Sequence, residues 1–319
     1  MAGPTFRAAP VRVQVPATSA NLGPGFDSFG LALQLYDFVG AQVTDAGLVV
    51  DIAGEGADEV KRDKRNLVVS SMRAAFDLLG GQPRGLEVNC ANRIPHGRGL
   101  GSSAAAIVAG ILTARELVLG GPDRLPDDAM LRLAAQLEGH PDNVAACLFG
   151  GFTLAWSDVD EFGATSHAVR LDVHPDIAPV AFVPETKAST AKVRKLLPEQ
   201  VPHHDAAANA ARAGLLVEAL TQRPDLLLVS THDVLHQPYR APAMPRSAAL
   251  VEKLREAGIP AVISGAGPTV LALPTAARVG ELAAFESKSF VMSPLAVDTQ
   301  GARALTDDAR ALTDDARER

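Results

Sequence analysis

The chain has 319 residues, of which 47% are hydrophobic and 21% are charged, and its net charge is −7. This length allows two domains, and the composition excludes wholesale disorder. The excess of acidic side chains argues against a general nucleic-acid binder, which needs positive charge to neutralise phosphates.

Cysteine usage and hydropathy indicate where such a protein works. Cys90 and Cys147 are too few for a disulfide framework and have no CxxC spacing, which is typical of a reducing compartment. The N-terminal stretch lacks the apolar core of a secretion signal, and no run of about 18 apolar residues could span a bilayer. We therefore expect a cytoplasmic protein that has no membrane partner.

Apolar periodicity predicts helices and strands mixed along the whole chain. Valines alternate with polar residues from 11 to 15, as in a half-buried strand that ends at Pro16. Asn66 is a candidate helix N-cap, with Gly80 as the matching stop. In chain order we expect strands at 11–15, 38–43, 48–52, 86–90, 152–156, 180–183, 261–264 and 269–273, and helices at 66–79, 104–119, 127–137, 143–148, 190–197, 206–220 and 247–257. This mixture predicts α+β layers.

A polar stretch at 157–165 is the best candidate for a domain boundary, because apolar periodicity lapses there and charge rises. We expect an N-terminal domain over residues 1–160 and a C-terminal domain over 161–300. The sole tryptophan, Trp156, is expected to pack in the core or between the domains. Residues 301–319 contain ALTDDAR twice in succession, and with one large apolar side chain per copy they predict a solvated tail without function.

The strongest chemical signal is the stretch PHGRGLGSSAAA from Pro95 to Ala106. It stands between a predicted strand and a very apolar helix. Its three glycines let the backbone approach a ligand, and the two serines stand where the helix N-terminus attracts anions. A flexible turn is the plain alternative. The loop lacks the lysine of GxxxxGKS and the GxGxxG spacing, so it belongs to neither common nucleotide-binding class.

This glycine loop resembles the ATP-binding motif of the GHMP kinases. Two further segments match that superfamily in the expected order, PATSANLGPGFDSFGLAL at 16–33 and SGAGPTVLAL at 264–273. Within the superfamily the first segment is most similar to the homoserine kinase family. Three more stretches agree with that family, namely EGHPDNVAACLFGGF at 138–152, STAKVRKLLP at 189–198 and HQPYR at 236–240.

The resemblance implies a fold and a reaction. The fold is the two-domain α+β architecture of GHMP kinases, with an N-terminal domain like domain 2 of ribosomal protein S5 and a ferredoxin-like C-terminal domain. The reaction is ATP-dependent phosphorylation of the side-chain hydroxyl of L-homoserine, which gives O-phospho-L-homoserine in threonine biosynthesis. ATP and homoserine would meet between the domains. A homodimer is also expected by resemblance, since dimers are common in the family.

The resemblance also implies which residues hold ATP and Mg²⁺. Gly265 and Gly267 belong to the C-terminal glycine motif. Glu138 and Ser103 match the metal positions, and their oxygens suit a hard cation. Taken alone, Glu138 would be an exposed carboxylate at a helix end. The ATP-binding residues implied by the loop motif are Pro95, His96, Gly97, Arg98, Gly99, Leu100, Gly101, Ser102, Ser103, Ala104 and Ala105.

Homoserine is a zwitterion, so its site needs a cation for the carboxylate and oxygen acceptors for the ammonium. Arg194 and Arg240 match the family's carboxylate-binding arginines, because guanidinium grips a carboxylate with two donors. Asn21 and Asp27 suit the ammonium. Taken singly, Arg194 could be solvated surface and Asp27 could cap a helix. Thr190, four residues before Arg194, is expected on the same helix face and in contact with substrate or phosphate.

His140, Asp142 and Asn143 are the remaining candidates for contact with the reacting hydroxyl. Mevalonate-type members have an aspartate near position 143, whereas this chain has an amide, which cannot act as a base. Either Asp142 takes the proton or no base is used, because a loose phosphoryl-transfer transition state depends mainly on alignment. His232 and His236 have the spacing of a metal pair but lack a nearby third ligand, so we expect them on a helix face.

Two other functions compete with this one. A GHMP kinase for another hydroxylated small molecule would not use the arginines for an amino-acid carboxylate. A catalytically silent metabolite sensor would have a damaged phosphate loop or lack Glu138, and both are intact here.

Overall fold

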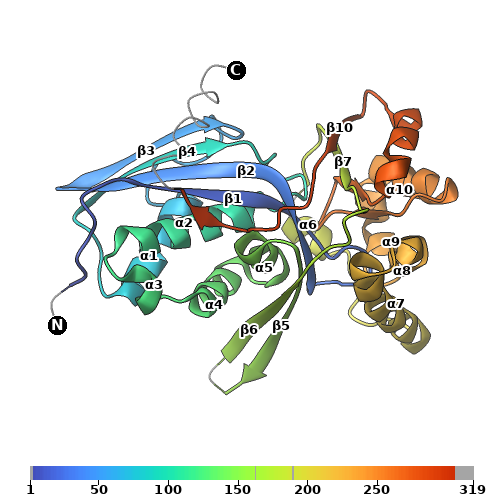
Figure 1. Ribbon diagram of the computed structural model, residues 1–319, viewed down its shortest axis with the longest axis horizontal. Helices are drawn as coiled ribbons and strands as arrows, with labels where there is room; N and C mark the ends of the chain where they lie inside the picture. The colour runs from blue at the N-terminus through green and yellow to red at the C-terminus, as the bar shows by residue number, and fades with distance from the viewer. Residues whose placement is uncertain (1–2, 162, 189, 306–319) are drawn as a thin grey trace.

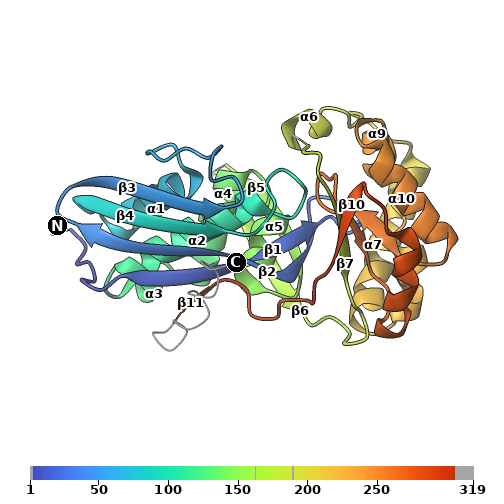
Figure 2. The same cartoon turned by 90° about the horizontal axis from the view of Figure 1, so that it is seen from above.

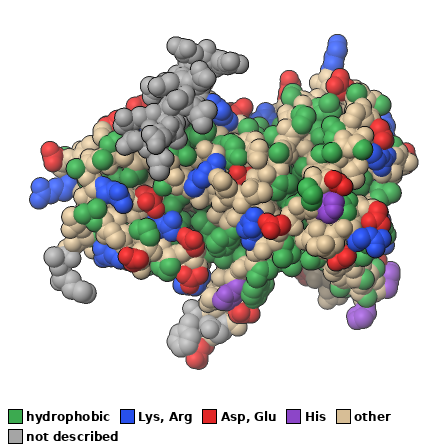
Figure 3. Space-filling model, viewed as in Figure 1, with side chains coloured by type: hydrophobic (Ala, Val, Ile, Leu, Met, Phe, Trp, Pro, Cys, Tyr) green, Lys and Arg blue, Asp and Glu red, His purple; other side chains and the backbone are tan. Residues whose placement is uncertain are grey.

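The computed structural model describes residues 3–161, 163–188 and 190–305, which form an α+β fold built on two sheets (Figure 1). The duplicated ALTDDAR stretch lies outside these residues, apart from its first two positions. On the face seen in Figure 3, acidic and basic side chains are interspersed. Among the described residues, none of the helices is long and apolar enough to cross a membrane.

The larger sheet belongs to the first half of the chain, with one short strand added from the C-terminal end. Its strand order is β11-β1-β2-β4-β3, and β5 joins β2 and continues to β6. β3 and β4 are parallel, whereas the other pairs are antiparallel. The strands are β1 (Val11–Ala20), β2 (Phe29–Thr44), β3 (Gly47–Gly54), β4 (Gly85–Asn92), β5 (Phe152–Asp160), β6 (Gly163–Leu171) and β11 (Arg303–Ala304).

β1 does not end at Pro16 as the sequence predicted. It runs on to Ala20, and its register against β2 shifts between Pro16 and Ala17. A strand irregularity tolerates proline, which has no N–H to donate to the ladder. The extension matters because it carries the chain to the turn that holds Asn21 and Asp27.

Helices cover one face of this sheet (Figures 1 and 2). Asn66 caps α1 as predicted, since its side chain accepts hydrogen bonds from the backbone N–H groups of Val68 and Val69, and Gly80 ends the helix in the left-handed conformation. α4 is capped at Pro126 and has Asp127 in its first turn. The helices are α1 (Leu67–Leu79), α2 (Ser102–Leu117), α3 (Gly121–Arg124), α4 (Asp127–Glu138) and α5 (Asp142–Phe149).

The central helix, α2, is buried on most of its surface, which explains why its sequence is apolar almost throughout. Its buried side chains join the core that also contains residues of the sheet and of the neighbouring helices. A helix buried in this way has a fixed axis. Its N-terminus is therefore held firmly at the end of the glycine loop.

The smaller sheet has the antiparallel order β10-β7-β9-β8 and a separate apolar core. The helix predicted at 190–197 ends earlier, at Arg194. The strands are β7 (Val180–Pro184), β8 (Ala261–Ile263), β9 (Val270–Ala272) and β10 (Phe290–Pro294), and the α-helices are α6 (Thr190–Arg194), α7 (His203–Thr221), α8 (Leu227–Ser230), α9 (Gln237–Arg240) and α10 (Pro245–Glu256). Three 3₁₀ segments complete it: η1 (Pro224–Leu226), η2 (Ala241–Ala243) and η3 (Ala276–Phe285).

The polar stretch at 157–165 lies in the β5–β6 hairpin, and both of these strands belong to the larger sheet. The division into domains at 160/161 stays a prediction. Trp156 is 45% exposed and stacks on His167 with ring centroids 5.3 Å apart, so the expectation that it packs in a core is wrong.

Candidate active site

The glycine loop connects β4 to α2 and requires glycine at three positions. Gly97, Gly99 and Gly101 have φ values of 67°, 81° and 72°, a region that side chains with a Cβ disfavour. Space is also limited: a Cβ at Gly101 would lie 2.0 Å from the Thr18 hydroxyl oxygen, and one at Gly99 would lie 2.3 Å from the Ser264 carbonyl oxygen. The loop is therefore pressed against its neighbours and leaves its backbone free to face a ligand.

The C-terminal glycine motif is one of those neighbours. The Ser264 hydroxyl donates to the Gly99 carbonyl at 2.5 Å, and the Thr269 N–H donates to the Arg98 carbonyl at 3.1 Å. The Arg98 guanidinium donates to the carbonyl of Pro184 at 2.7 Å. The second half of the chain thus braces the loop, which gives a physical reason for the two glycine motifs to occur together.

A cavity of about 170 Å³ lies where the loop, the end of α4, the start of α5 and the C-terminal motif converge. It brings together most of the residues that the sequence predicted for substrate and metal. Thr190 begins α6, but its side chain is outside the described part of the chain. The predicted residues that line this cavity are Asn21, Asp27, Gly97, Gly99, Gly101, Ser102, Ser103, Glu138, His140, Asp142, Asn143, Arg194, Arg240, Gly265 and Gly267.

One wall of this cavity carries acidic groups. The Ser103 hydroxyl donates to the Glu138 carboxylate at 2.7 Å. Burial raises the pKa of Glu138 above its ordinary value, although the bond from Ser103 opposes that rise. Since a cation would relieve a desolvated carboxylate, this pair of oxygens suits a metal ion.

Next to it, His140 and Asp142 form a second pair. His140 Nδ1 lies 2.7 Å from Asp142 Oδ1, and the hydrogen bond to this carboxylate raises the pKa of His140. The same oxygen accepts the backbone N–H of Asn143 at 2.7 Å. The Asn143 side-chain oxygen accepts from the Thr18 hydroxyl at 2.8 Å. Sequence reasoning missed Thr18, although it stands inside the first matching motif.

A second part of the cavity lining, called the cationic wall here, contains Arg194 and Arg240. Arg194 forms an ion pair with Asp27, and its Nη1 also lies 3.3 Å from Asp27 Oδ1. Arg240 is only 2% exposed, and its Nη1 lies 3.3 Å from both the Gly265 carbonyl oxygen and His236 Nδ1. Its Nε has no hydrogen-bond partner, and among the described residues it forms no ion pair. Burial and the nearby Arg194 lower the pKa of Arg240. A buried cation that has no direct ion pair among the described residues points to an anionic ligand, although Asp27, Asp233 and Asp142 also favour its charge.

The turn after β1 shapes this wall. Asn21 and Asp27 have φ values of 69° and 56°, which is uncommon for residues other than glycine and is frequent at binding sites. The Asn21 side chain holds the turn, since its oxygen accepts the Asp27 N–H at 3.0 Å and its nitrogen donates to the Gly265 carbonyl at 2.9 Å. Asn21 is thus a support of the site, with its amide already occupied on both sides.

His236 is not on a helix face with His232, as the sequence had suggested. It is the N-cap residue of α9 and is fully buried. Its Nε2 lies 2.8 Å from the Gly23 carbonyl oxygen and must donate, which leaves Nδ1 to accept from Arg240. Burial lowers the pKa of His236, consistent with a neutral ring. The four-residue spacing to Arg240 was the sequence signal for this contact.

A second cavity of about 240 Å³ adjoins the same loop and is lined mainly by apolar residues of β2, β3, β4, α1 and α2. Ser102 and Ser103 line both cavities. Asp37 lines its inner end, where burial raises the pKa of that carboxyl to about 6. The glycine loop thus ends between a mainly apolar cavity and a polar one.

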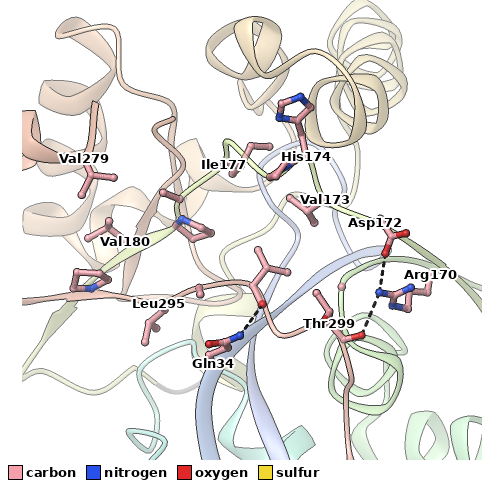
Figure 4. A pocket seen from close by; sticks show the side chains of 17 residues that line it. Gln34, Arg170, Asp172, Val173, His174, Ile177, Val180, Val279, Leu295 and Thr299 are labelled. Carbon is pink, nitrogen blue, oxygen red and sulfur yellow. Dashed lines mark hydrogen bonds and ion pairs between the residues drawn. The ribbon is translucent and has the colours of Figure 1, made fainter. Parts of the chain in front are cut away.

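A cavity of about 760 Å³ lies elsewhere, between the segments that run from one sheet to the other (Figure 4). Its polar side chains are occupied by one another or by backbone. Arg170 donates to Asp172 at 2.8 Å and to the Thr299 carbonyl at 3.2 Å, and Gln34 donates to the Val297 carbonyl at 3.3 Å. None of the predicted site residues lines it.

Comparison with known proteins defines the class first. The family model "GHMP kinases N terminal domain" matches residues 66–151, and "GHMP kinases C terminal" matches residues 206–288. A crystal structure of homoserine kinase from Cytophaga hutchinsonii is similar with a TM-score of 0.80 and 28% identity, covering 96% of this chain and all of that one. The fold is therefore that of the GHMP kinases, as the motifs predicted.

The particular family follows from full-length relatives. The chain is 61% identical to homoserine kinase of Streptomyces avermitilis over 305 residues, which cover 96% of this chain and 99% of that protein. It is 62% identical to homoserine kinase of Streptomyces coelicolor over 305 residues, 96% of this chain and 97% of that one. The chain belongs to the homoserine kinase family, and it is a kinase.

Proposed function

We propose that this chain transfers the γ-phosphoryl group of ATP to the side-chain hydroxyl of L-homoserine, giving O-phospho-L-homoserine in threonine biosynthesis, and that the 170 Å³ cavity is where transfer occurs. The observation that carries the proposal is Arg240, a buried guanidinium with a free Nε and no ion-pair partner among the described residues. An amino-acid carboxylate supplies the missing charge. The two relatives named above support the substrate.

The substrate's two charges match the two groups on the cationic wall. The carboxylate binds Arg240 and Arg194, and the ammonium binds the Asp27 carboxylate, which Asn21 holds in place through the Asp27 N–H. This assignment directs the hydroxyl end of homoserine toward Asn143, which lines the same cavity as the two arginines.

ATP binds across both cavities. The apolar chamber of about 240 Å³ suits the adenosine moiety, and the backbone of Gly97 to Ser103 receives the phosphates at the start of α2. The fit is supported by the left-handed glycines and by the close packing at Gly101, where a Cβ would lie 2.0 Å from Thr18 Oγ1. Arg98 acts from behind the loop, because its guanidinium already donates to backbone carbonyls of Pro184 and Glu185.

Glu138 and Ser103 hold Mg²⁺ together with the phosphates. The donor set fits, since a desolvated carboxylate and an adjacent hydroxyl are hard oxygen ligands. When bound, Mg²⁺ neutralises charge on the phosphate oxygens. Among the described residues no group of three or more His, Cys, Asp or Glu side chains could hold a metal alone, so the phosphates complete the site.

Catalysis rests on alignment. Asp142 already accepts from His140 and from the Asn143 N–H, so its role is to orient these two neighbours. Asn143, held by Thr18, positions the homoserine hydroxyl, and loop backbone amides stabilise charge on the transferring group. Proton removal by Asp142 is the alternative, and the two are separated by a pH profile in the Discussion.

A homodimer is the second part of the proposal. The β5–β6 hairpin projects from the body of the protein (Figure 1), and apolar side chains gather along it (Figure 3). Trp156, Val159 and Val169 on this hairpin are 45%, 80% and 46% exposed. Exposed apolar groups of this kind mark interaction surfaces. Sedimentation equilibrium tests whether the protein is a dimer. The fluorescence of Trp156, the sole tryptophan, reports whether the hairpin is buried in the dimer interface.

A coupled ADP-release assay with MgATP tests the reaction, using L-homoserine, L-serine, L-threonine, mevalonate and galactose, repeated with Arg240→Ala. We expect turnover of homoserine alone and a steep rise in its KM in the variant. If another alcohol reacts and homoserine does not, the proposed substrate is wrong. If no compound in the panel reacts, the alternative of a catalytically silent metabolite sensor is favoured. The exposed Arg246 on α10 provides the matched control, Arg246→Ala, with unchanged KM.

A further inference from the structure

We infer that Phe26 is a positioning residue that holds the two substrate-binding arginines through its aromatic ring. The inference rests on the proposed roles of Arg194 and Arg240. Phe26 follows a glycine in the turn between β1 and β2 and is half-buried. It lies inside the motif at 16–33 and directly precedes Asp27, but the sequence alone does not show which residues its ring contacts.

Three groups of the cationic wall meet at this ring. The Cζ atom of Arg194 lies 5.4 Å from the ring centroid and that of Arg240 lies 5.2 Å from it. The ring of His236 lies 5.1 Å away at an interplanar angle of 31°. Both arginine distances are within the range of cation–π attraction. One side chain therefore contacts both guanidinium groups and the histidine that accepts from Arg240.

The charges explain why an aromatic ring is needed here. Two guanidinium groups that serve one carboxylate must lie close together, and burial together with the charge of Arg194 lowers the pKa of Arg240. The Asp27 carboxylate forms an ion pair with Arg194, whereas Arg240 has no ion pair among the described residues. The negative face of an aromatic ring attracts both cations and leaves their N–H donors free.

The hydrogen bonds of Arg240 also leave its charge available to a ligand. Its hydrogen-bond partners are the Gly265 carbonyl and the neutral ring of His236, and its Nε stays free. Arg194 differs because it also pairs with Asp27. Phe26 is adjacent to Asp27 in the chain, so one turn supplies both the anion for Arg194 and the ring for both arginines.

The test compares Phe26→Leu, which removes the ring, with Phe26→Tyr, which keeps it. Steady-state constants are measured for L-homoserine, for ATP and for L-homoserine amide, which lacks the carboxylate charge. We expect Phe26→Leu to raise the KM for homoserine about tenfold, equivalent to about 1.4 kcal/mol, with kcat and the KM for ATP unchanged. Phe26→Tyr restores the wild-type KM. The KM for the amide stays the same in all three proteins.

A second cation–π pair provides the matched control. Arg93 lies over the half-buried Phe38 with 5.6 Å between Cζ and the ring centroid, so Phe38→Leu removes a comparable contact outside the polar cavity and leaves the KM for homoserine unchanged. Circular dichroism melting confirms that each variant is folded.

The outcomes separate the inference from the proposed function. An equal rise in KM for homoserine and its amide in Phe26→Leu would overturn the inference, because the ring would then act on packing and not through the arginines. The same holds if Phe26→Tyr fails to restore KM. If Arg240→Ala leaves the KM for homoserine unchanged, the carboxylate clamp itself is wrong, whatever Phe26 does.

Discussion

The Arg194 guanidinium is ion-paired with the Asp27 carboxylate, which stands 167 positions earlier in the chain. α6 of the second half supplies one partner and the turn after β1 supplies the other. The two side chains are 36% and 37% exposed, so water screens their attraction and opening the pair costs little. A zwitterionic substrate presents both opposite charges at once, and it can replace this internal pair with two intermolecular ones.

This exchange predicts how the two partners respond to substitution. Arg194→Gln and Asp27→Asn should each raise the KM for homoserine about 10–100-fold, because each leaves one substrate charge without its partner. The melting temperature should change little, since a half-exposed ion pair adds little stability. Steady-state kinetics and thermal melts check both effects. The exposed residues Arg246 and Asp45 give matched controls, Arg246→Gln and Asp45→Asn, and a large loss of stability in either site variant would contradict the assignment.

Gly101 and Gly120 permit a sharp test of the phosphate loop. Both have φ of 72°, but a Cβ at Gly101 would lie 2.0 Å from Thr18 Oγ1, whereas no atom lies within 4 Å of one at Gly120. Gly120→Ala should therefore show only the backbone cost of about 1–2 kcal/mol in unfolding free energy. Gly101→Ala should show a larger loss and raise the KM for ATP at least tenfold. Urea unfolding and ATP kinetics measure this, and equal behaviour of the two variants would exclude the steric explanation.

Local patterns predicted much of this molecule. The N-cap and the C-cap of α1 could be predicted because Asn66 and Gly80 make their capping contacts within the same helix. The glycine loop could be predicted because a left-handed backbone at the start of a helix requires glycine. The motif resemblance, rather than periodicity, indicated the fold and grouped residues that now line one cavity.

Long-range contacts explain what the sequence did not predict. The sequence predicted a strand end at Pro16 because proline lacks an N–H. The strand continues because β1 pairs with β2 both before and after Pro16. His236 was expected on a helix face because its actual partner, the Gly23 carbonyl, lies 213 positions away in the chain and cannot be seen locally. The pairing of β5 with β6 was not predicted for the same reason, since strand pairing is a tertiary property.

Glu138 is expected to act on the metal. Glu138→Gln removes the charge and should lower kcat/KM about 100-fold and raise the Mg²⁺ concentration needed for half-maximal rate. Glu256→Gln is a matched control, because Glu256 also ends a helix but is exposed and outside both cavities. The measurement is a Mg²⁺ titration at saturating ATP and homoserine. An unchanged Mg²⁺ dependence in Glu138→Gln would remove Glu138 from the metal site.

Asp142→Asn distinguishes alignment from base catalysis. If Asp142 only orients His140 and Asn143, kcat should fall about tenfold and its pH profile should keep its shape. The pKa of His140, followed by NMR, should fall, since the bond to Asp142 is the main cause of its rise. A loss of 1,000-fold or more, together with loss of the acidic limb of the profile, would identify Asp142 as the base. The control is Asp158→Asn on the β5–β6 hairpin, where Asp158 Oδ2 lies 3.4 Å from His167 Nε2.

Asp37 predicts how stability depends on pH. Its pKa rises from 3.8 to about 6, mainly through burial, so the folded state favours the neutral carboxyl. Its stabilising contribution is complete below pH 3.8 and is lost as pH rises through about 6. Asn keeps the oxygen that accepts the N–H groups of Arg93 and Ile94, and it cannot ionise.

Asp37→Asn should therefore match the wild type near pH 4 and exceed its unfolding free energy by up to about 3 kcal/mol at pH 8. Urea unfolding of both proteins at the two pH values gives this difference, and acid effects common to both cancel. Asp45→Asn, at an exposed position, should show no such divergence. If Asp37→Asn is instead less stable at pH 8, the ionised carboxylate is stabilised by its two N–H donors more than it is opposed by burial, and the sign of the pKa shift is reversed.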